Sequence, residues 1–463
     1  MTDEFMGPVS PLGEMLKRTD RCGEEIWRLT AGAPMYGIPR KQWAALSGAV
    51  SAEDAFLVLK HKKGISMLYD VSDLSDVTDV PLLDKPLTMV RDRKCPFFLH
   101  EVFHRDYEKV ITTTLGHQGQ VFYRWLQKES GWNTDLLWDY LLKNCHQEDY
   151  FLNMHLNYVI PTGRSNLKWT EEHLKHHSLA LVMHLYYPDM LEESCSFALR
   201  FPKQTHVIVT TSSEEKRRQI LEVFSKQEFA SLSVRVIGNR GRDVSALLVG
   251  AAEVFDEYDY VCFFHDKKTL QTKPGTVGVG FAYKLQENLF ATKDYVNNVI
   301  RLFSENPRLG MLSPTPPHHG GYFCTLGRKW GPNYDNALAL SRQMGFTTPI
   351  APDKMPIAPL GTCFWFRGSA MKPLSDHHWR YEEFPPEPNG IDGTLLHAIE
   401  RIYPFACAEA GFYPAFMLSD RYAGIEYSSM RYYVRDFNQI CIEAGYLGYH
   451  KDMCRSLSER LKD

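Results

Sequence analysis

The sequence predicts an α/β protein whose central sheet is mostly parallel and is covered by helices on both faces. From about residue 178 onward, short apolar segments typical of strands alternate with amphipathic segments whose apolar residues recur at helical spacing. This order of strand, helix and strand favours parallel pairing with right-handed crossovers. The chain has 463 residues, of which 44% are hydrophobic and 13% aromatic, so it can bury more than one core.

The expected elements follow one another regularly after residue 178. We expect strands at 178–187, 205–211, 231–238, 258–266 and 308–314, and a further strand within 358–371. We expect helices at 189–201, 214–227, 243–255 and 282–306, and another that follows the Pro- and Gly-rich start of 384–401. Ser212 and Glu215 form a capping-box pattern, which predicts where the second of these helices begins.

The pattern changes near residues 159–178, which predicts two domains. We expect a smaller α/β or mainly helical accessory domain at 1–165, where 54–71 is strand-like and 135–145 is helical in pattern. The α/β domain, with a C-terminal helical extension, is expected at 166–463. The N-terminus lacks a basic start followed by an apolar stretch, and no window approaches the roughly 18 apolar residues of a membrane span. These features favour a cytoplasmic protein whose membrane contact is peripheral.

Charge and cysteine content exclude some classes of function. The formal net charge is −4, with 52 basic and 56 acidic residues, so the chain shows no general electrostatic preference for nucleic acid. Any phosphate that it binds must be met by a local cluster. The ten cysteines are scattered without a CxxC pair, which favours reduced, buried thiols.

A basic turn follows the third expected strand, in "GNRGRDVSALL" at 238–248. Gly241 can adopt positive φ, and Asp243 stands where a helix would begin. Guanidinium groups beside backbone amides suit a diphosphate, because their donors match two phosphate oxygens. A capping turn with solvated arginines explains the pattern equally well. The donor-binding candidates of this turn are Asn239, Arg240, Gly241, Arg242 and Asp243.

The fourth expected strand ends in charged residues, His265, Asp266, Lys267 and Lys268. A polar turn after a buried strand is the simpler interpretation of this run. However, the carboxyl ends of neighbouring parallel strands meet at one edge of a sheet. We therefore expect this cluster and the basic turn to face the same ligand.

Two later segments contribute further candidates. Arg367 ends the strand expected within 358–371, and the loop of 384–401 brings Glu387 and Asp392 to the start of a helix. A carboxylate near a helix N-terminus is stabilised as the anion, which is the form that a general base needs. A helix cap is the alternative role for Asp392. We expect His397 and Glu400, inside that helix, to be packing and surface residues.

Six motifs in this order carry a resemblance to a known family. They are "VMHLYYPDM", "VTTSS", "NRGRDVSALL", "YDYVCFFHDKK", "GTCFWFRGSAM" and "FPPEPNGIDGTLLHAIER", and over about 178–425 they resemble the rhamnan synthesis protein F family of bacterial glycosyltransferases. The resemblance implies inverting transfer of L-rhamnose from a dTDP-L-rhamnose donor to a lipid-linked cell-wall or capsular polysaccharide. It implies peripheral contact with the inner face of the cell membrane. A different nucleotide sugar, or a non-catalytic role in polysaccharide assembly, remains as the alternative.

The motif order also resembles the GT-A fold of nucleotide-sugar enzymes, whose fourth strand ends in an Asp-x-Asp motif that holds a divalent cation. In this sequence His265 takes the first acidic position and Lys267 the second. We therefore expect no metal, with the Lys267 ammonium supplying the positive charge. A Mg²⁺ or Mn²⁺ ion held by Asp266 is the alternative. The resemblance makes the ends of the first two strands candidates for the nucleoside pocket, namely His184, Asp189, Thr210 and Thr211.

Overall fold

The computed structural model describes residues 138–266, 275–316 and 330–445, except for 140, 144, 155 and 391, and also three strands at 35–39, 56–62 and 65–71. The chain divides into two compact units. One is Leu156–Asp436, and the other combines Met1–His155 with Phe437–Asp463. The domain boundary that the sequence suggests at residue 165 stays a prediction.

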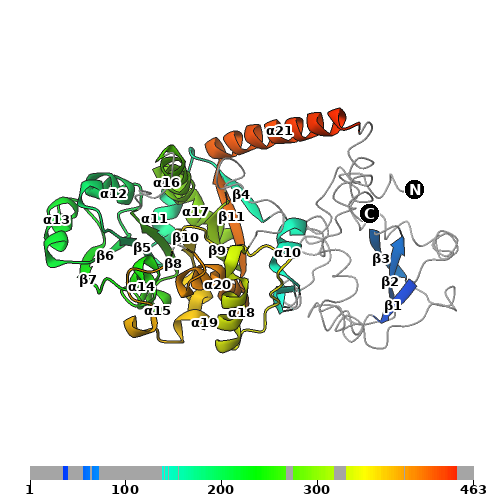
Figure 1. The fold of residues 1–463 in the computed structure, drawn as a ribbon, viewed down its shortest axis with the longest axis horizontal. Helices are drawn as coiled ribbons and strands as arrows, with labels where there is room; N and C mark the ends of the chain where they lie inside the picture. Colours follow the sequence, from blue (N-terminus) through cyan, green and yellow to red (C-terminus); the bar gives the residue numbers. More distant parts are fainter. Residues whose placement is uncertain are drawn as a thin grey trace. The chain divides into compact units, whose positions relative to one another are not determined.

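The larger unit is built on one eight-stranded sheet (Figure 1). Its strands are β4 Asn157–Ile160, β5 Leu179–His184, β6 His206–Thr211, β7 Ser231–Val236, β8 Tyr260–His265, β9 Leu309–Pro314, β10 Phe364–Phe366 and β11 Tyr413–Ser419. They lie in the order β4-β11-β9-β10-β8-β5-β6-β7. Every neighbouring pair is parallel except the two that include β10. The predicted α/β class with a mostly parallel sheet is confirmed.

The short strand β10 runs against both of its neighbours. Phe364 pairs with Phe263 and Phe366 with Val261, so the chain leaves β10 at the amino end of β8. The sequence could not reveal this direction, because three consecutive aromatic residues fit a buried strand of either polarity. The reversal decides which edge of the sheet receives the residue that follows β10.

The predicted helices are present, and two of them are each divided in two. The helices around the sheet are α12 Leu191–Ala198, α13 Glu214–Phe224, α14 Arg242–Leu248, α15 Val254–Glu257, α16 Gly275–Phe290, α17 Lys293–Glu305 and α20 Leu395–Glu409. The single helix expected at 243–255 is therefore α14 and α15. The helix expected at 282–306 breaks because the Thr292 side chain caps α17, accepting a hydrogen bond from the Tyr295 N–H at 3.0 Å.

The predicted capping box of α13 was wrong by one position. Ser213 is the N-cap, and its hydroxyl accepts from the backbone N–H of Lys216 at 3.3 Å. The hydroxyl of Ser212 instead lies 3.0 Å from the Lys216 ammonium. Both serines can reach the same lysine, so sequence spacing alone could not separate their roles.

The remaining described elements of the chain are mostly short. They are α11 Leu167–His173, η2 Pro188–Met190, η4 Gly331–Asn333, α18 Tyr334–Gln343, η5 Gly368–Met371, α19 Lys372–Ser375, η6 Tyr381–Glu383 and the longer α21 Asp420–Glu443. Among the described residues, no helix combines the length and the apolar character that crossing a membrane requires.

The core of the larger unit encloses the centre of the sheet on both faces. Tyr260–Phe264 of β8 are at most 3% exposed. Val261 and Phe263 point into a cluster that also contains residues of α14, α15 and α20, whereas Phe264 contacts rings from α12 and α16 on the other face. A strand buried on both faces has a continuous apolar sequence, as β8 does. This packing fixes the position of the residues at the end of β8.

The other unit contains a small antiparallel sheet. Its strands are β1 Met35–Pro39, β2 Phe56–Lys62 and β3 Ile65–Val71, in that order. The strand-like segment at 54–71 is therefore a hairpin of two strands. Residues 138, 139 and 141–143 are helical, as the pattern at 135–145 predicts, and α10 Gln147–Met154 follows.

Candidate functional site

Three neighbouring strands place polar side chains at the carboxyl edge of the parallel strands. His184, at the end of β5, pairs in register with Thr210 of β6 and with His265 of β8. The His184 Nδ1 atom lies 3.0 Å from the Thr210 hydroxyl oxygen. Burial, together with the neighbouring His265, lowers the pKa of His184 to about 4. At neutral pH His184 is therefore an uncharged hydrogen-bonding group.

Asp266, directly after β8, is a buried carboxylate that holds the loop after β5. Its Oδ2 atom accepts hydrogen bonds from the backbone N–H groups of Tyr186 at 2.8 Å and Tyr187 at 2.7 Å. Burial raises the pKa of Asp266 to about 6, although these two hydrogen bonds oppose the increase. Its Oδ1 atom is buried and has no hydrogen-bond partner in the part of the chain that the structure describes. One strong acceptor thus stays available at this edge.

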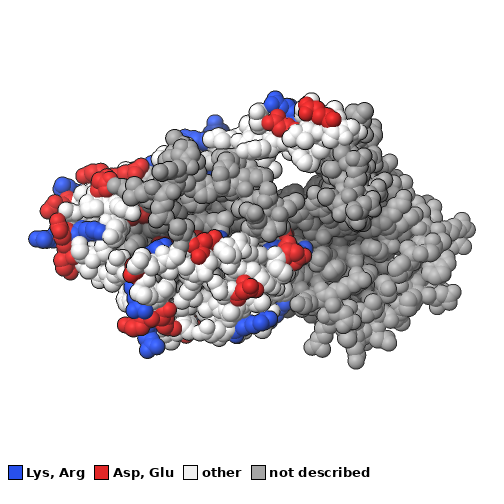
Figure 2. All heavy atoms as spheres, viewed as in Figure 1, with Lys and Arg blue, Asp and Glu red and all other residues white. Residues whose placement is uncertain are grey.

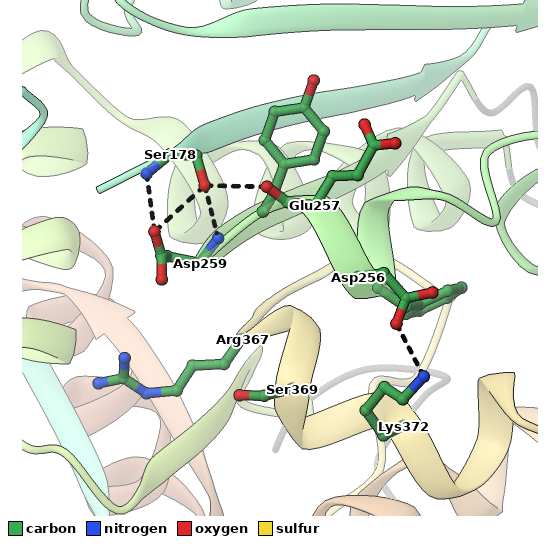
Figure 3. A pocket seen from close by; sticks show the side chains of 9 residues that line it. Ser178, Asp256, Glu257, Asp259, Arg367, Ser369 and Lys372 are labelled. Atoms are coloured by element: carbon green, nitrogen blue, oxygen red, sulfur yellow. Dashed lines mark hydrogen bonds and ion pairs between the residues drawn. The ribbon is translucent and has the colours of Figure 1, made fainter. Parts of the chain in front are cut away.

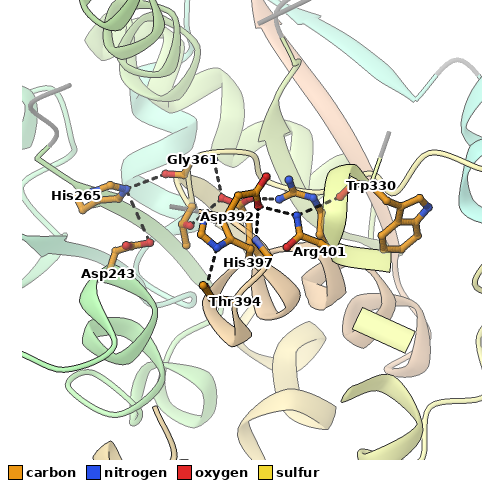
Figure 4. A network of polar contacts seen from close by, with 12 residues as sticks. Asp243, His265, Trp330, Gly361, Asp392, Thr394, His397 and Arg401 are labelled. Atoms are coloured by element: carbon orange, nitrogen blue, oxygen red, sulfur yellow. Dashed lines mark hydrogen bonds and ion pairs between the residues drawn. The ribbon is translucent and has the colours of Figure 1, made fainter. Parts of the chain in front are cut away.

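A chain of polar contacts links β8 to α20 (Figure 4). The His265 Nε2 atom lies 2.8 Å from the carbonyl oxygen of Gly361 and 3.9 Å from Asp243 Oδ2. Because a carbonyl oxygen only accepts, Nε2 carries a proton in this arrangement. The Gly361 N–H in turn donates to Glu400 Oε2 at 2.8 Å. These contacts connect the end of β8, the start of α14 and the helix α20.

Glu400 stabilises a strained turn next to His265. Gly361 and Thr362 have φ angles of 91° and 52°, in the left-handed region. Glu400 accepts from the Gly361 N–H and from the Thr362 hydroxyl, and its other oxygen pairs with Arg401. The expectation of Glu400 as a surface residue was wrong, since it is only 8% exposed. A buried carboxylate with these partners holds the turn in place.

Asp392 lies just before α20 and keeps one carboxylate oxygen open. Its Oδ1 atom accepts from the Asn333 amide and from the Gly393 N–H, both at 2.8 Å, whereas Oδ2 has no hydrogen-bond partner among the described residues. Partial burial pushes its pKa upward, but these bonds and the charges of His397 and Arg401 outweigh burial and lower the pKa. Asp392 is thus an ionised, partly exposed acceptor. It is not the helix cap, because Thr394 occupies the N-cap position of α20.

The basic turn has the backbone shape that its sequence predicts. Gly241 has φ of 82°, and a Cβ atom there would lie 2.7 Å from Phe384 Cγ, so only glycine fits. Arg242 also has positive φ, at 49°. The Ser245 hydroxyl donates to the carbonyl oxygens of Arg240 and Arg242 and closes the turn.

Both arginines of this turn bind the segment 382–390 that leads to Asp392, which we call the carboxylate loop. The Arg240 guanidinium donates to the carbonyl oxygens of Phe384 at 2.5 Å and Glu382 at 2.9 Å. Arg242 makes a two-pronged contact with Glu387, at 2.8 Å and 3.0 Å. The hydrogen bond from Arg242 lowers the pKa of Glu387. The structure therefore joins two motifs that the sequence only placed at the same edge.

Arg367 does not join these residues. Because β10 is reversed, Arg367 lies at the opposite, amino edge of the parallel strands. Its guanidinium donates to the carbonyl oxygens of Leu309 at 2.8 Å and Phe303 at 2.5 Å, and to Asn306 at 3.3 Å. It therefore holds the C-terminal end of α17 beside β9.

A polar pocket of about 280 Å³ lies at this amino edge (Figure 3). Figure 3 shows Ser178 and Asp259 joined by hydrogen bonds and Asp256 paired with Lys372. Its charged groups are largely engaged with one another. The pocket lies at the amino edge of the parallel strands, whereas His265 and Asp392 lie at the carboxyl edge.

The other predicted residues have varied surroundings. Thr211 is buried, and its hydroxyl donates to the Leu185 carbonyl oxygen at 2.7 Å, which ties β6 to the loop after β5. Asp189 lies in η2 after β5, Asn239 lies in the turn after β7, and both residues are exposed. Lys267 and Lys268 lie outside the described residues.

Charge on the described surface is mixed. Figure 2 shows basic and acidic side chains interspersed over the visible face of the described residues. In the same part of the chain, no group of three or more His, Cys, Asp or Glu side chains has a metal-binding arrangement.

Sequence reasoning missed several residues that shape this edge. Asn333 orients Asp392, and Glu400 holds the turn at Gly361. Lys216 places its ammonium 3.3 Å from the ring centre of Tyr186. These partners come from segments far apart in sequence, so no local pattern could have identified them. The closest signal was the Gly-Thr pair at 361–362, which suggests a tight turn before β10.

Comparison with known proteins gives two kinds of similarity. Over 239 residues the chain is 29% identical to "Uncharacterized protein WxcX" from Xanthomonas campestris pv. campestris, in strains B100 and ATCC 33913. Each match covers 50% of this chain and 32% of the relative, so the chain spans about a third of the length of the curated relatives it matches. The rhamnan synthesis protein F family matches residues 63–412, which is well over half of the chain. The chain therefore belongs to the rhamnan synthesis protein F family, and the family's description connects it with polysaccharide synthesis.

Proposed function

We propose that this protein is an inverting glycosyltransferase that moves L-rhamnose from dTDP-L-rhamnose to a lipid-linked cell-wall or capsular polysaccharide. The observation that carries the proposal is Asp392, an ionised carboxylate with an open oxygen at the carboxyl edge of the sheet. The mostly parallel sheet is consistent with it, because the order of the motifs resembles that of the GT-A fold. Membership of the rhamnan synthesis protein F family supports the choice of sugar.

In the proposed reaction Asp392 acts as the general base. It takes the proton of an acceptor hydroxyl while that oxygen forms a bond to C1 of the rhamnose. The bond between C1 and the diphosphate oxygen breaks on the opposite face, and dTDP leaves with the bonding electron pair. We favour Asp392 over Glu387 because both carboxylate oxygens of Glu387 are engaged by Arg242. The lowered pKa keeps Asp392 deprotonated at neutral pH.

The donor is proposed to bind where β5, β6 and β8 end. His184 and Thr210 form one hydrogen-bonded pair there, and Asp266 fixes the backbone of the loop after β5. The diphosphate would lie near His265, with Lys267 and Lys268 supplying positive charge. On this proposal the reaction needs no Mg²⁺ or Mn²⁺, and excess EDTA leaves turnover unchanged. A loss of turnover in EDTA that returns with Mn²⁺ would instead assign the cation to Asp266.

The proposed acceptor, a lipid-linked glycan, rests only on membership of the rhamnan synthesis protein F family. A lipid-linked glycan would bring the protein to the inner face of the cell membrane as a peripheral protein. Flotation with vesicles that contain a lipid-linked glycan tests this contact. Protein that stays at the bottom of the gradient with and without the lipid-linked glycan would contradict it.

The function is tested by nucleotide release from a panel of sugar nucleotides. We expect free dTDP from dTDP-L-rhamnose in the presence of the glycan acceptor, and no UDP from UDP-glucose. A thermal-shift measurement on the same panel gives donor binding independently, because a ligand of the folded state raises the melting temperature. Donor binding without release in the presence of acceptor would indicate a non-catalytic role in polysaccharide assembly. Release from UDP-glucose alone would contradict the rhamnose assignment.

A further inference from the structure

Among the described residues, every hydrogen bond from the two guanidinium groups of the basic turn goes to the carboxylate loop. Arg240 binds the first part of the carboxylate loop through two carbonyl oxygens. Arg242 binds the second part through Glu387 and through the carbonyl oxygen of Asn389 at 3.1 Å. The loop is thus held at two points, one at residues 382–384 and one at residues 387–389, and both precede Asp392.

The backbone of the turn is shaped for these contacts. Two consecutive residues, Gly241 and Arg242, have left-handed φ angles, which is unfavourable for arginine. The Ser245 hydroxyl bonds the carbonyl oxygens on both sides of Gly241 and stabilises this conformation. Phe384 is fully buried and packs so closely on Gly241 that a side chain there would collide with it. The turn and the loop therefore fit one another as a packed unit.

The pair of Arg242 and Glu387 is strengthened from both sides. The two-pronged geometry matches the planar guanidinium to the planar carboxylate. Glu387 Oε2 also accepts from the Asn389 N–H at 2.9 Å, so the carboxylate shapes its own loop as well. The side chains of Arg242 and Glu387 are 41% and 26% exposed, so water competes with the contact only in part. Arg242 Nη2 also donates to the carbonyl oxygen of Asn389, so a diphosphate could make a two-pronged contact with Arg242 only by displacing Glu387 or that carbonyl oxygen.

We propose that the basic turn positions the carboxylate loop, and through it Asp392, against the acceptor hydroxyl, and that its arginines do not bind the donor diphosphate. The proposal rests on the function proposed above. It makes Arg240, Arg242 and Glu387 positioning residues that act through Asp392. Specificity for the acceptor would then depend on the turn, and affinity for the donor would not.

Donor affinity and turnover, measured separately, distinguish the two roles of the arginines. In Arg242→Ala and in Glu387→Gln we expect the Kd for dTDP, measured by calorimetry, to stay within about twofold of the parent value. We expect kcat to fall, or the acceptor KM to rise, by about tenfold or more, since one charged hydrogen-bonded contact is lost. The double variant should lose no more than either single one, because both changes break the same contact. Arg242→Lys should lie between the parent and Arg242→Ala.

The opposite result is equally specific. A loss of dTDP affinity of about tenfold or more in Arg242→Ala, with affinity unchanged or improved in Glu387→Gln, would show that Arg242 binds the diphosphate and overturn the proposal. In that case Glu387 would merely compete for the arginine.

Hydrogen exchange tests the positioning role without any substrate. Residues 385, 386 and 388 are prolines without an amide hydrogen, so the readout is the backbone amides of Glu387, Asn389 and Gly390. These amides should exchange about tenfold faster in Arg242→Ala and Glu387→Gln than in the parent. Arg301→Ala is the matched control, because Arg301 also pairs with a glutamate, Glu305, on the surface of α17. Unchanged exchange in the loop would overturn the proposal. If the parent neither binds dTDP nor turns over donor, the proposed function fails, and this measurement still decides whether the turn holds the loop.

Discussion

The two edges of the eight-stranded sheet use charged side chains differently. At the amino edge, the Arg367 guanidinium donates hydrogen bonds to three carbonyl oxygens, and the Lys372 ammonium lies 2.7 Å from a carboxylate oxygen of both Asp256 and Asp376. At the carboxyl edge, Asp266 and Asp392 each keep one oxygen without a hydrogen-bond partner among the described residues. The comparison shows that charged groups at the amino edge are engaged with protein partners, whereas two carboxylates at the carboxyl edge each keep an acceptor open.

The two carboxylates that keep an open oxygen are each fixed through their other oxygen. Asp266 is fixed by two backbone N–H groups, and Asp392 by an amide side chain and one N–H group. One oxygen of each carboxylate thus anchors the side chain while the other stays available. Such preorganisation is what a reacting or binding group requires, because it need not reorder when the substrate arrives.

The largest expected effect is the loss of transfer in Asp392→Asn. The amide cannot accept the acceptor proton, so turnover should fall by about 10² to 10⁴. Affinity for dTDP should stay nearly unchanged, because the base acts on the acceptor. Asp256→Asn, an exposed carboxylate at the amino edge, is the matched control and should retain full turnover. Full turnover in Asp392→Asn and loss in Glu387→Gln would move the base to Glu387, whereas retention in both would refute the proposed site.

The second prediction concerns stability and pH at Asp266. Its pKa is raised from 3.8 to about 6 in the folded protein, so the folded state binds the proton more tightly than the unfolded chain. As pH rises from about 4 to about 6, the unfolded state loses its proton first, and the free energy of unfolding falls. The total change is at most about 3 kcal/mol for a shift of this size. Asp266→Asn cannot ionise and should lose this part of the pH dependence.

Urea denaturation of parent and variant between pH 4 and pH 7 measures this difference. Relative to the parent, Asp266→Asn should become more stable as pH rises. Asp392→Asn is the control, because the lowered pKa of Asp392 contributes stability that is lost only as pH falls below the ordinary aspartate value of 3.8. Its curve should therefore stay nearly parallel to that of the parent between pH 5 and pH 7. Parallel curves for the parent and Asp266→Asn would mean that Asp266 has an ordinary pKa.

A somewhat smaller effect is expected at the amino edge from Arg367→Ala. The change leaves the carbonyl oxygens of Leu309 and Phe303 without their donor and removes the guanidinium that lies over the Tyr260 ring. Unfolding should become easier by about 1 to 3 kcal/mol, measured by urea denaturation. The Kd for dTDP should not change, since Arg367 lies at the far edge. A weaker Kd with unchanged stability would mean that the amino edge binds the donor.

Much of the fold could be predicted from sequence because local patterns decide it. Continuous apolar strands such as β8, helical spacing in the intervening segments and the glycine at 241 are all local signals. The direction of β10 could not be predicted, because it depends on where the chain crosses the sheet. Because this direction was unknown, the sequence pattern grouped Arg367 with residues of the carboxyl edge, whereas it lies at the amino edge.

For the candidate site, the sequence could predict only the edge of the sheet at which its residues lie. Strand ends place His184, Thr210, His265 and Asp266 together, since parallel strands share one carboxyl edge. Their partners come from other segments, as with Asn333 beside Asp392 and Glu400 beside Gly361. Such contacts depend on tertiary packing, which has no signature at one position of a single sequence.

The smallest expected effect is a loss of stability when the N-cap of α13 is removed, and it concerns a polar group at the carboxyl edge that we expect to be structural. Ser213 follows β6 at this edge and caps α13, whereas the Ser212 hydroxyl is hydrogen-bonded to the side chain of Lys216. Ser213→Ala leaves the N–H of Lys216 without its acceptor and should cost about 1 kcal/mol of unfolding free energy. Ser212→Ala should cost clearly less, because its lysine partner can turn to water. Urea denaturation of both variants decides the assignment, and the Kd for dTDP should be the same in each. A larger loss of stability in Ser212→Ala would return the cap to the position that the sequence suggested, and a loss of dTDP affinity in Ser213→Ala would extend the binding site to the start of α13.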